Sequence, residues 1–116
     1  MGLAKRSYMK AILPIELVKR LDPSDSLGVN TVLMLLYTMQ YPGSTIKEFE
    51  RVSGMSKSSA SRHILILTER GDRARERPGL GLVMTFEDPH DARAKRVKLT
   101  PKGEKLKAEI DKVMET

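Results

Sequence analysis

The chain has 116 residues, of which 40% are hydrophobic and 31% charged, a balance typical of a folded globular chain and not of a disordered one. It contains no Cys, which excludes disulfides and thiolate metal sites. The longest purely aliphatic run, residues 64–67, is far too short to cross a membrane. With no visible signal peptide either, we expect a cytoplasmic protein without a membrane partner.

The net charge of +6 is concentrated in the second half of the chain. Residues 56–107 contain thirteen Lys and Arg against seven Asp and Glu, so the rest of the chain is neutral overall. Such a basic region is typical of a surface that binds a polyanion, although a solvated charged face would have the same composition. Aromatic residues are limited to three Tyr and two Phe, which argues against a base-stacking surface for single strands.

Two helices are predicted first. Residues 4–21 have helical spacing, with Pro14 either kinking the segment or starting a second short helix. The segment 22–26, DPSDS, is predicted to be a loop, and residues 27–40 form a strongly apolar helix. Four side chains of this helix share one face and are expected to be buried: Val32, Leu35, Leu36 and Met39.

The next segment has the pattern of a helix-turn-helix. Thr45 and Glu48 have the spacing of a capping box at a helix start. Gly54 suits the left-handed residue that ends this helix. Ser56 is a natural N-cap for the following helix, which is predicted to extend to about Arg70. Two short helices joined by a tight turn containing Gly define the motif.

The second helix of this pair, SKSSASRHILIL, changes from polar to aliphatic halfway along. Ala60, Ile64 and Leu67 share a face that we expect to pack on the preceding helices. The polar side chains of the first two turns lie away from that face, and the helix N-terminus adds partial positive charge. The pattern therefore predicts a helix with one end buried and the other facing an anionic, grooved ligand.

A β-hairpin and a last helix complete the chain. The basic, glycine-containing segment 72–81 is irregular, and strands are predicted at 82–87 and 95–100, with the hairpin tip at 89–93. Thr100 caps a helix whose first residue is Pro101. The element order predicts a mainly α fold with a small β-hairpin wing, a winged helix-turn-helix.

We expect one domain over residues 1–116. Its core spans 27–100, between an N-terminal helical segment, 1–26, and a C-terminal helix, 101–116. The apolar side chains of the last helix and of residues 8–18 would either build a dimer interface or close the core of a monomer; in the last helix these are Leu106, Ile110 and Val113.

The hairpin sequence resembles the wing signature of MarR-family regulators. DPHDARAKRVKLTPKG, residues 88–103, matches the form D-P-x-D-x-R-x-x-x-V-x-L-T-x-x-G. Residues 53–71 are similar to that family's turn and recognition helix, and the resemblance covers roughly residues 27–105. The matched positions of the signature are Asp88, Pro89, Asp91, Arg93, Val97, Leu99, Thr100 and Gly103.

The resemblance implies a function and several residue roles. The recognition helix, about 57–70, would enter the major groove of DNA, and the wing tip, 89–93, would reach the minor groove. Arg93 would be the residue that enters the minor groove, and Asp91 would hold basic side chains of the wing and recognition helix in place. Family members usually form homodimers through long terminal helices. The shorter helices here count against both the usual dimer and the effector pocket beside it, so a small-molecule effector is not favoured.

The predicted function is therefore a sequence-specific, double-stranded DNA-binding transcriptional regulator, acting as a homodimer without a cofactor. The segment 72–81 is longer than the family's usual link and would either follow the phosphate backbone or form a mobile surface loop. Candidate DNA-binding residues are Ser56, Lys57, Ser58, Ser59, Ser61, Arg62, Arg73, Arg75, Arg77, Arg93, Lys95 and Arg96.

Two alternatives use the same basic face: a protein-interaction module that binds an acidic protein, and an RNA or replication factor. An enzyme is not expected, since no nucleophile–base pair or phosphate-binding glycine loop stands out. His90 lies between Asp88 and Asp91, but with no Cys in the chain and no second His nearby no metal is expected there. His63 is expected to be packed or to face a phosphate rather than to bind a metal.

Overall fold

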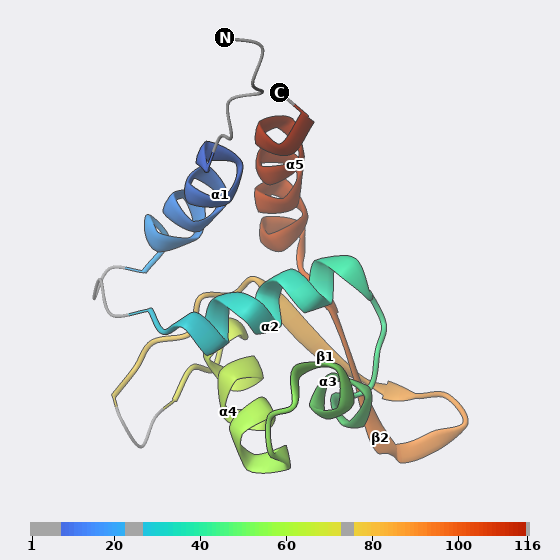
Figure 1. Ribbon diagram of the computed structural model, residues 1–116. Coiled ribbons are helices and arrows are strands. Elements are labelled where there is room, and N and C mark those ends of the chain that lie inside the picture. Colours follow the sequence, from blue (N-terminus) through green and yellow to red (C-terminus); the bar gives the residue numbers. More distant parts are fainter. Residues whose placement is uncertain (1–7, 23–26, 73–75, 116) are drawn as a thin grey trace, which may run out of the picture.

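The computed structural model describes residues 8–22, 27–72 and 76–115. In these ranges the elements follow the order helix, helix, helix, helix, hairpin, helix (Figure 1). Their bounds are α1 (Met9–Lys19), α2 (Val29–Gln40), α3 (Ile46–Ser53), α4 (Lys57–Leu67), β1 (Val83–Asp88), β2 (Asp91–Leu99) and α5 (Pro101–Glu115). The predicted winged helix-turn-helix is confirmed.

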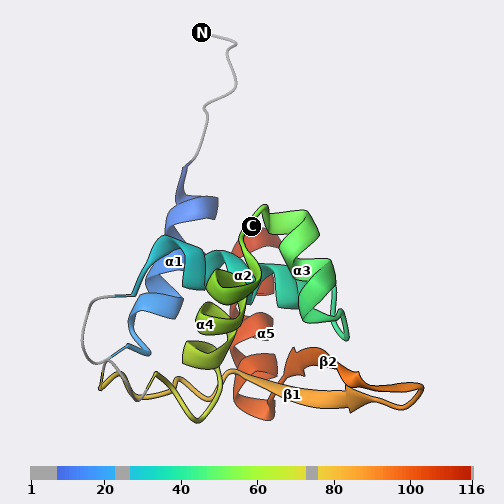
Figure 2. The same cartoon turned by 90° about the horizontal axis from the view of Figure 1, so that it is seen from below.

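Helix α2 separates the molecule into two parts. Helices α1 and α5 stand together on one side of it, and α3 and α4 lie on the other side (Figure 1). The hairpin projects away from the helical body, as the rotated view shows clearly (Figure 2). The terminal helices are therefore remote from the end of the molecule that carries α3, the start of α4 and the wing.

The first two helices differ in detail from the prediction. Helix α1 begins at Met9 and continues through Pro14 as a single helix, so Pro14 does not start a new one; residues 4–7 of the predicted helix lie outside the described residues. Helix α2 begins at Val29, with Gly28 as its extended N-cap. Neither change alters the order of elements.

The buried face of α2 was predicted wrongly. Besides Leu35, its buried side chains are Thr31, Met34 and Thr38, whereas Val32, Leu36 and Met39 are only half-buried. Hydropathy ranks Thr as polar, but a hydroxyl can be buried when it is hydrogen-bonded. Thr38 donates to the carbonyl of Met34 within the helix at 2.8 Å, so its burial leaves no polar group unpaired.

A buried polar contact joins α2 to α4. Thr31 Oγ1 lies 2.8 Å from His63 Nδ1, and both side chains are buried. Among the described residues, the other ring nitrogen, Nε2, has no hydrogen-bond partner. Burial lowers the pKa of His63 below its usual 6.5, and the positive charges of Arg62 and Arg77 lower it further. His63 is therefore a packed neutral side chain on α4.

The wing is an antiparallel hairpin with a tighter turn than predicted. The strands pair from Val83–Leu99 to Asp88–Asp91, and only Pro89 and His90 lie outside them. The expected tip at 89–93 is thus too long. The reason is an Asp side chain at the turn: Asp88 Oδ1 accepts the backbone N–H of His90 at 2.7 Å and closes a two-residue connection.

The junction between β2 and α5 explains the T-x-x-G part of the wing signature. Thr100 Oγ1 donates to the carbonyl of Gly81 at 2.6 Å and accepts the N–H of Gly103 at 3.1 Å. A Cβ on Gly103 would collide with the Leu82 carbonyl. The first turn of α5 therefore packs directly on the backbone that enters the hairpin.

The hydrophobic core runs through all of these elements. It contains Phe49 of α3, Ala60, Ile64 and Leu67 of α4, Val83 of β1 and Val97 of β2. Leu106 and Ile110 of α5 also belong to it and pack in the same cluster as Val18 of α1. Of the two roles predicted for Leu106, Ile110 and Val113, Leu106 and Ile110 serve the core of the single chain, whereas Val113 is half-buried and outside that cluster.

We expect Gly103→Ala to destabilise the fold. The added methyl group would push α5 away from the Leu82 carbonyl, which should cost about 1–3 kcal/mol and exceed the gain of about 1 kcal/mol in helix propensity. Urea unfolding would measure the difference. Lys105→Ala, on the exposed side of the same helix, is the matched control and should stay within about 0.5 kcal/mol of wild type. Equal stability of both variants would contradict the close packing.

We also expect the protein to lose stability as the pH falls below about 6.5. The pKa of His63 is lower in the folded than in the unfolded state, so the unfolded state binds the proton more tightly and stability rises with pH through this range. The free energy of unfolding should thus fall more steeply between pH 7.5 and 5.5 in wild type than in His63→Gln. Parallel pH profiles for the two proteins would show that His63 does not titrate on unfolding.

Candidate nucleic-acid interface

The start of α4 is held by its own serines. Ser56 is the N-cap of α4, and its Oγ accepts the N–H of Ser59 at 3.2 Å. The preceding turn is fixed by Gly54, whose φ of 74° is left-handed, and by the Ser53 hydroxyl, which accepts the N–H of Met55. Ser56 therefore has a structural role at the position where the sequence placed a candidate DNA contact.

Burial along α4 follows the predicted change of character. Lys57, Ser58 and Arg62 are exposed, and Ser59 and Ser61 are half-buried. The side chains buried in the core face and the last turns are Ala60, His63, Ile64, Ile66 and Leu67. The N-terminal half of the helix thus remains open to a ligand.

The helix ends at Leu67, three residues before the predicted end at Arg70. The carbonyls of its last turn accept backbone N–H groups from the segment that leads into the hairpin. Leu80 donates to the Ile66 carbonyl, and Leu82 donates to the Leu67 carbonyl. Thr68 also donates its hydroxyl to the Leu65 carbonyl at 2.6 Å. These bonds replace the next helical turn and attach the wing to the C-terminal end of α4.

A groove of about 580 Å³ lies between the helix-turn-helix and the wing. Its walls come from the first turns of α3, the exposed N-terminal half of α4 and the beginning of β2. The lining residues are Thr45, Ile46, Lys47, Glu50, Lys57, Ser61, Asp91, Arg93, Ala94 and Lys95. The structure therefore brings Lys57 and Ser61 of α4 together with Arg93 and Lys95 of the wing.

The groove is positively charged overall. Four cations line it, Lys47, Lys57, Arg93 and Lys95, against two carboxylates, Glu50 and Asp91. A concave surface lined mainly by one sign of charge focuses the electrostatic potential and attracts an extended polyanion. Because the first turns of α3 and α4 also contribute to the walls, the partial positive charge of a helix N-terminus adds to the attraction for anions.

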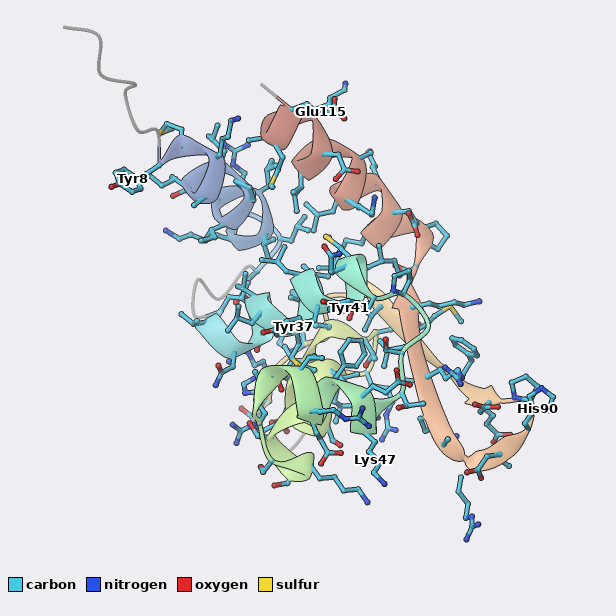
Figure 3. All side chains as sticks on the ribbon, turned by 45° about the vertical axis from the view of Figure 1, so that its right-hand side comes forward. Tyr8, Tyr37, Tyr41, Lys47, His90 and Glu115 are labelled. Atoms are coloured by element: carbon cyan, nitrogen blue, oxygen red, sulfur yellow. The ribbon has the colours of Figure 1, made fainter. Side chains whose placement is uncertain are left out.

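Lys47 is the groove residue that the sequence analysis missed. It is exposed in the first turn of α3, and Figure 3 shows its side chain extending between the helical body and the hairpin. The capping box of Thr45 and Glu48 fixes where α3 starts but not which elements face that start. No local signal therefore marked Lys47, because its place in the groove depends on the approach of α4 and β2.

Arg93 is the most open of the wing cations, with a side chain that is 96% exposed. Asp91 Oδ1 accepts the backbone N–H of Arg93 at 3.0 Å and lies 3.7 Å from its Nε. Among the described residues, no hydrogen bond joins Asp91 to α4. Asp91 therefore supports the local shape of the wing and leaves the Arg93 guanidinium available.

Arg96 is placed differently from the other candidate cations. Its Nε and Nη2 contact Asp88 Oδ2 at 2.8 and 2.7 Å, and its Nη1 donates to the Gly43 carbonyl at 2.6 Å. These partners occupy the guanidinium, and the Arg96 side chain is only 34% exposed. The His90 backbone N–H, with Arg96 beside it, holds the pKa of Asp88 below its usual value.

The described residues of the basic segment, 72 and 76–81, are not among those that line the groove. Asp72 and Arg77 exchange backbone hydrogen bonds of 2.9 and 2.8 Å. The Arg77 guanidinium lies 3.4 Å from the buried Asp22 carboxylate after α1. Arg73 and Arg75 lie outside the described residues. The structure thus turns Arg77 toward the terminal helices and not toward Arg93.

Two other features bear on the function class. No helix in the described ranges is both long and apolar enough to cross a membrane. Within the same ranges, no group of three or more His, Asp or Glu side chains is placed to hold a metal ion. His63 is buried against Thr31, and His90 is exposed at the wing turn (Figure 3).

No known family model matches the sequence, and no curated protein matches it. Solved structures do share its fold. The chain superposes on the transcriptional regulator Tm0710 of Thermotoga maritima with a TM-score of 0.68 and 18% identity, covering 93% of this chain and 66% of that one. For the MarR-like regulator Tm0816 of the same organism, the TM-score is 0.62, the identity 24%, and the coverage 97% and 77%.

A third similar structure contains DNA. A mutant MarR from E. coli, complexed with operator DNA, has a TM-score of 0.60 and 17% identity, with 91% of this chain and 69% of that chain covered. At identities this low, the structural superposition shows the fold alone. That fold is the winged-helix fold of MarR-type regulators. The chain spans about two thirds to three quarters of the length of these three proteins.

Proposed function

We propose that this protein is a transcriptional regulator that binds double-stranded DNA with the N-terminal half of α4 and with the wing. The observation that carries the proposal is the positively charged groove between these two elements, in which Lys57 and Ser61 face Arg93 and Lys95. Its occurrence in a fold shared with a MarR–operator complex supports duplex DNA as the polyanion. A regulator of this kind acts on the genome, in agreement with a cytoplasmic location.

Affinity and sequence preference are assigned to different residues. Lys57, Lys95 and the additional cation Lys47 would contact phosphates, which supply most of the affinity. Ser58, Ser61 and Arg62, on the exposed first turns of α4, would reach base edges in the major groove. Ser56 Oγ holds the Ser59 N–H at the helix start, so Ser56 and Ser59 would contact phosphates through their hydroxyl protons.

The wing would contact the neighbouring minor groove through Arg93. Its exposed guanidinium suits a narrow, A·T-rich groove, where the negative potential is strongest. Asp91 keeps the backbone of Arg93 in place without covering its side chain. Arg73, Arg75 and Arg77 would add to the positive field from the loop 72–81, Arg77 from its position beside Asp22.

A homodimer is part of the proposal. Helix α1 and its N-cap leave a row of large apolar side chains exposed, including Tyr8 at 70%, Met9 at 49% and Ile15 at 50%. Figure 3 shows Tyr8 pointing away from the rest of the molecule. Met114 at the end of α5 is also exposed. An apolar surface of this kind is typical of an interface, and a two-fold dimer would place two α4 helices on a pseudo-palindromic site. We assign it to a second copy and not to an effector.

Selection from a random duplex library at two salt concentrations tests the function. We expect enrichment of a two-fold symmetric motif and a steep loss of binding with salt. Lys57→Ala should reduce the slope of log affinity against log salt by about 0.9, the value for one phosphate contact. Lys112→Ala, an exposed cation on α5 remote from the groove, should leave the slope unchanged.

The other outcomes identify the alternatives. Salt-sensitive binding without an enriched motif would indicate a non-specific role, and enrichment without symmetry would argue against the dimer. Stronger binding to RNA than to duplex DNA would favour an RNA or replication factor. No binding even at low salt would exclude the DNA proposal and favour a protein-interaction module.

The division of labour predicts different losses for two arginines. Arg62→Ala should flatten the sequence preference in the major-groove positions, because a bidentate base contact contributes about 1–3 kcal/mol of discrimination. Arg93→Ala should weaken binding most on sites with A·T-rich flanks. The affinities of both variants for a panel of DNA sites would test this assignment. Equal losses of affinity on every sequence would contradict it.

A further inference from the structure

We propose that Arg96 is a positioning residue that fixes the wing to the loop between α2 and α3, and does not act as a phosphate ligand. The effect of Arg96 on DNA affinity rests on the proposed function. The contacts of Arg96 with Asp88 and Gly43 are a property of the protein without DNA. It assigns a different role to a cation that the charge pattern alone placed on DNA.

The contacts of Arg96 reach two separate parts of the molecule. One edge of the guanidinium, Nε and Nη2, binds Asp88 Oδ2 at 2.8 and 2.7 Å, and Nη1 donates to the Gly43 carbonyl at 2.6 Å. Asp88 is the last residue of β1, and Gly43 lies in the turn after α2. A planar guanidinium is suited to bridging two acceptors in fixed directions, which an ammonium group does less well.

The backbone strengthens the same junction. Gly43 donates its N–H to the Val97 carbonyl at 2.9 Å, and Val97 donates to the Ser44 carbonyl at 3.0 Å. Thr45 forms an isolated bridge with Arg96 itself. The loop therefore runs beside β2 as a short additional edge, immediately before the start of α3. Arg96 sits at this edge and joins it through its side chain to β1.

Asp88 connects this junction to the wing turn. Its Oδ2 binds Arg96 while its Oδ1 accepts the His90 backbone N–H at 2.7 Å. One carboxylate thus orders the turn and, through Arg96, sets the position of the hairpin relative to the helix-turn-helix. Because Arg93 is carried by the same strand as Arg96, the junction determines where Arg93 lies relative to α4.

Charge-preserving variants separate positioning from phosphate binding. Arg96→Lys keeps the positive charge but cannot bridge Asp88 and Gly43, so we expect DNA affinity to fall on the order of fivefold or more, the size of one lost groove contact. The salt slope should remain that of wild type, because no phosphate contact is removed. Lys95→Ala, one residue away, is the matched control and should reduce the slope by about 0.9. Wild-type affinity of Arg96→Lys would overturn the proposal.

Asp88→Asn should change DNA affinity in opposite directions if Asp88 acts only through its charge or if it positions Arg96. Removing a negative charge near DNA should tighten binding if only electrostatics matters. We expect weaker binding, because the neutral side chain holds Arg96 less firmly. Glu87→Gln removes the neighbouring carboxylate, which contacts only the exposed Lys95 among the described residues at 3.5 Å, and should bind as tightly as wild type or more tightly. Tighter binding by both variants would contradict a positioning role.

Hydrogen exchange tests the link without DNA. In Arg96→Lys and Asp88→Asn, the amides of Gly43 and Val97 should exchange faster than in wild type, while those of the α4 core residues stay protected. Lys95→Ala should exchange as wild type does. Unchanged exchange at Gly43 and Val97 would overturn the proposal even if DNA binding is weakened. If wild type binds no DNA while the exchange result holds, the proposed function fails and the structural link remains.

Discussion

Helix α4 is buried at one end and open at the other, and the arrangement of the molecule depends on this asymmetry. Its C-terminal turns contribute Ile64 and Leu67 to the core, and its last carbonyls accept N–H groups from Leu80 and Leu82. These bonds attach the segment that leads into β1, so the end of the helix also fixes the start of the hairpin. The N-terminal turns, capped by Ser56, remain free to line a groove with the wing. Burial of the C-terminal half of α4 thus holds the N-terminal half in place at the surface, where it lines the groove.

The basic residues divide according to what holds them. Lys47, Lys57, Arg93 and Lys95 line the groove, and the exposed ion pairs of Arg93 with Asp91 and of Lys95 with Glu87 leave these charges accessible to a ligand. Arg96 and Arg77 are less exposed and join segments that are distant in sequence, Arg96 through the Gly43 carbonyl and Arg77 through the Asp22 carboxylate. A guanidinium with two firm acceptors has lost much of its capacity to bind phosphate, whereas an exposed one retains it. Net charge therefore overstates the number of cations that a polyanion would meet.

Local signals predicted the elements well. The capping box of Thr45 and Glu48, the left-handed Gly54 and the N-cap Ser56 each lie where the sequence placed them, because these motifs depend on residues within four positions of one another. The predictions that were wrong concern contacts with distant segments. The face of α2 turned to bury Thr31 because His63 supplies a partner, and α4 ended early because residues 80–82 took its last carbonyls.

The sequence by itself therefore determined the order of helices and strands, the starts of α3, α4 and α5 and the winged-helix fold, since caps, periodicity and turn residues act over short ranges. It also located the basic half of the chain. Only the tertiary structure decided which cations share a groove, because that depends on the approach of α3, α4 and β2 in space. It brought Lys47 to the groove and committed Arg96 to Asp88 and Gly43, and neither outcome is encoded within a few residues of those side chains.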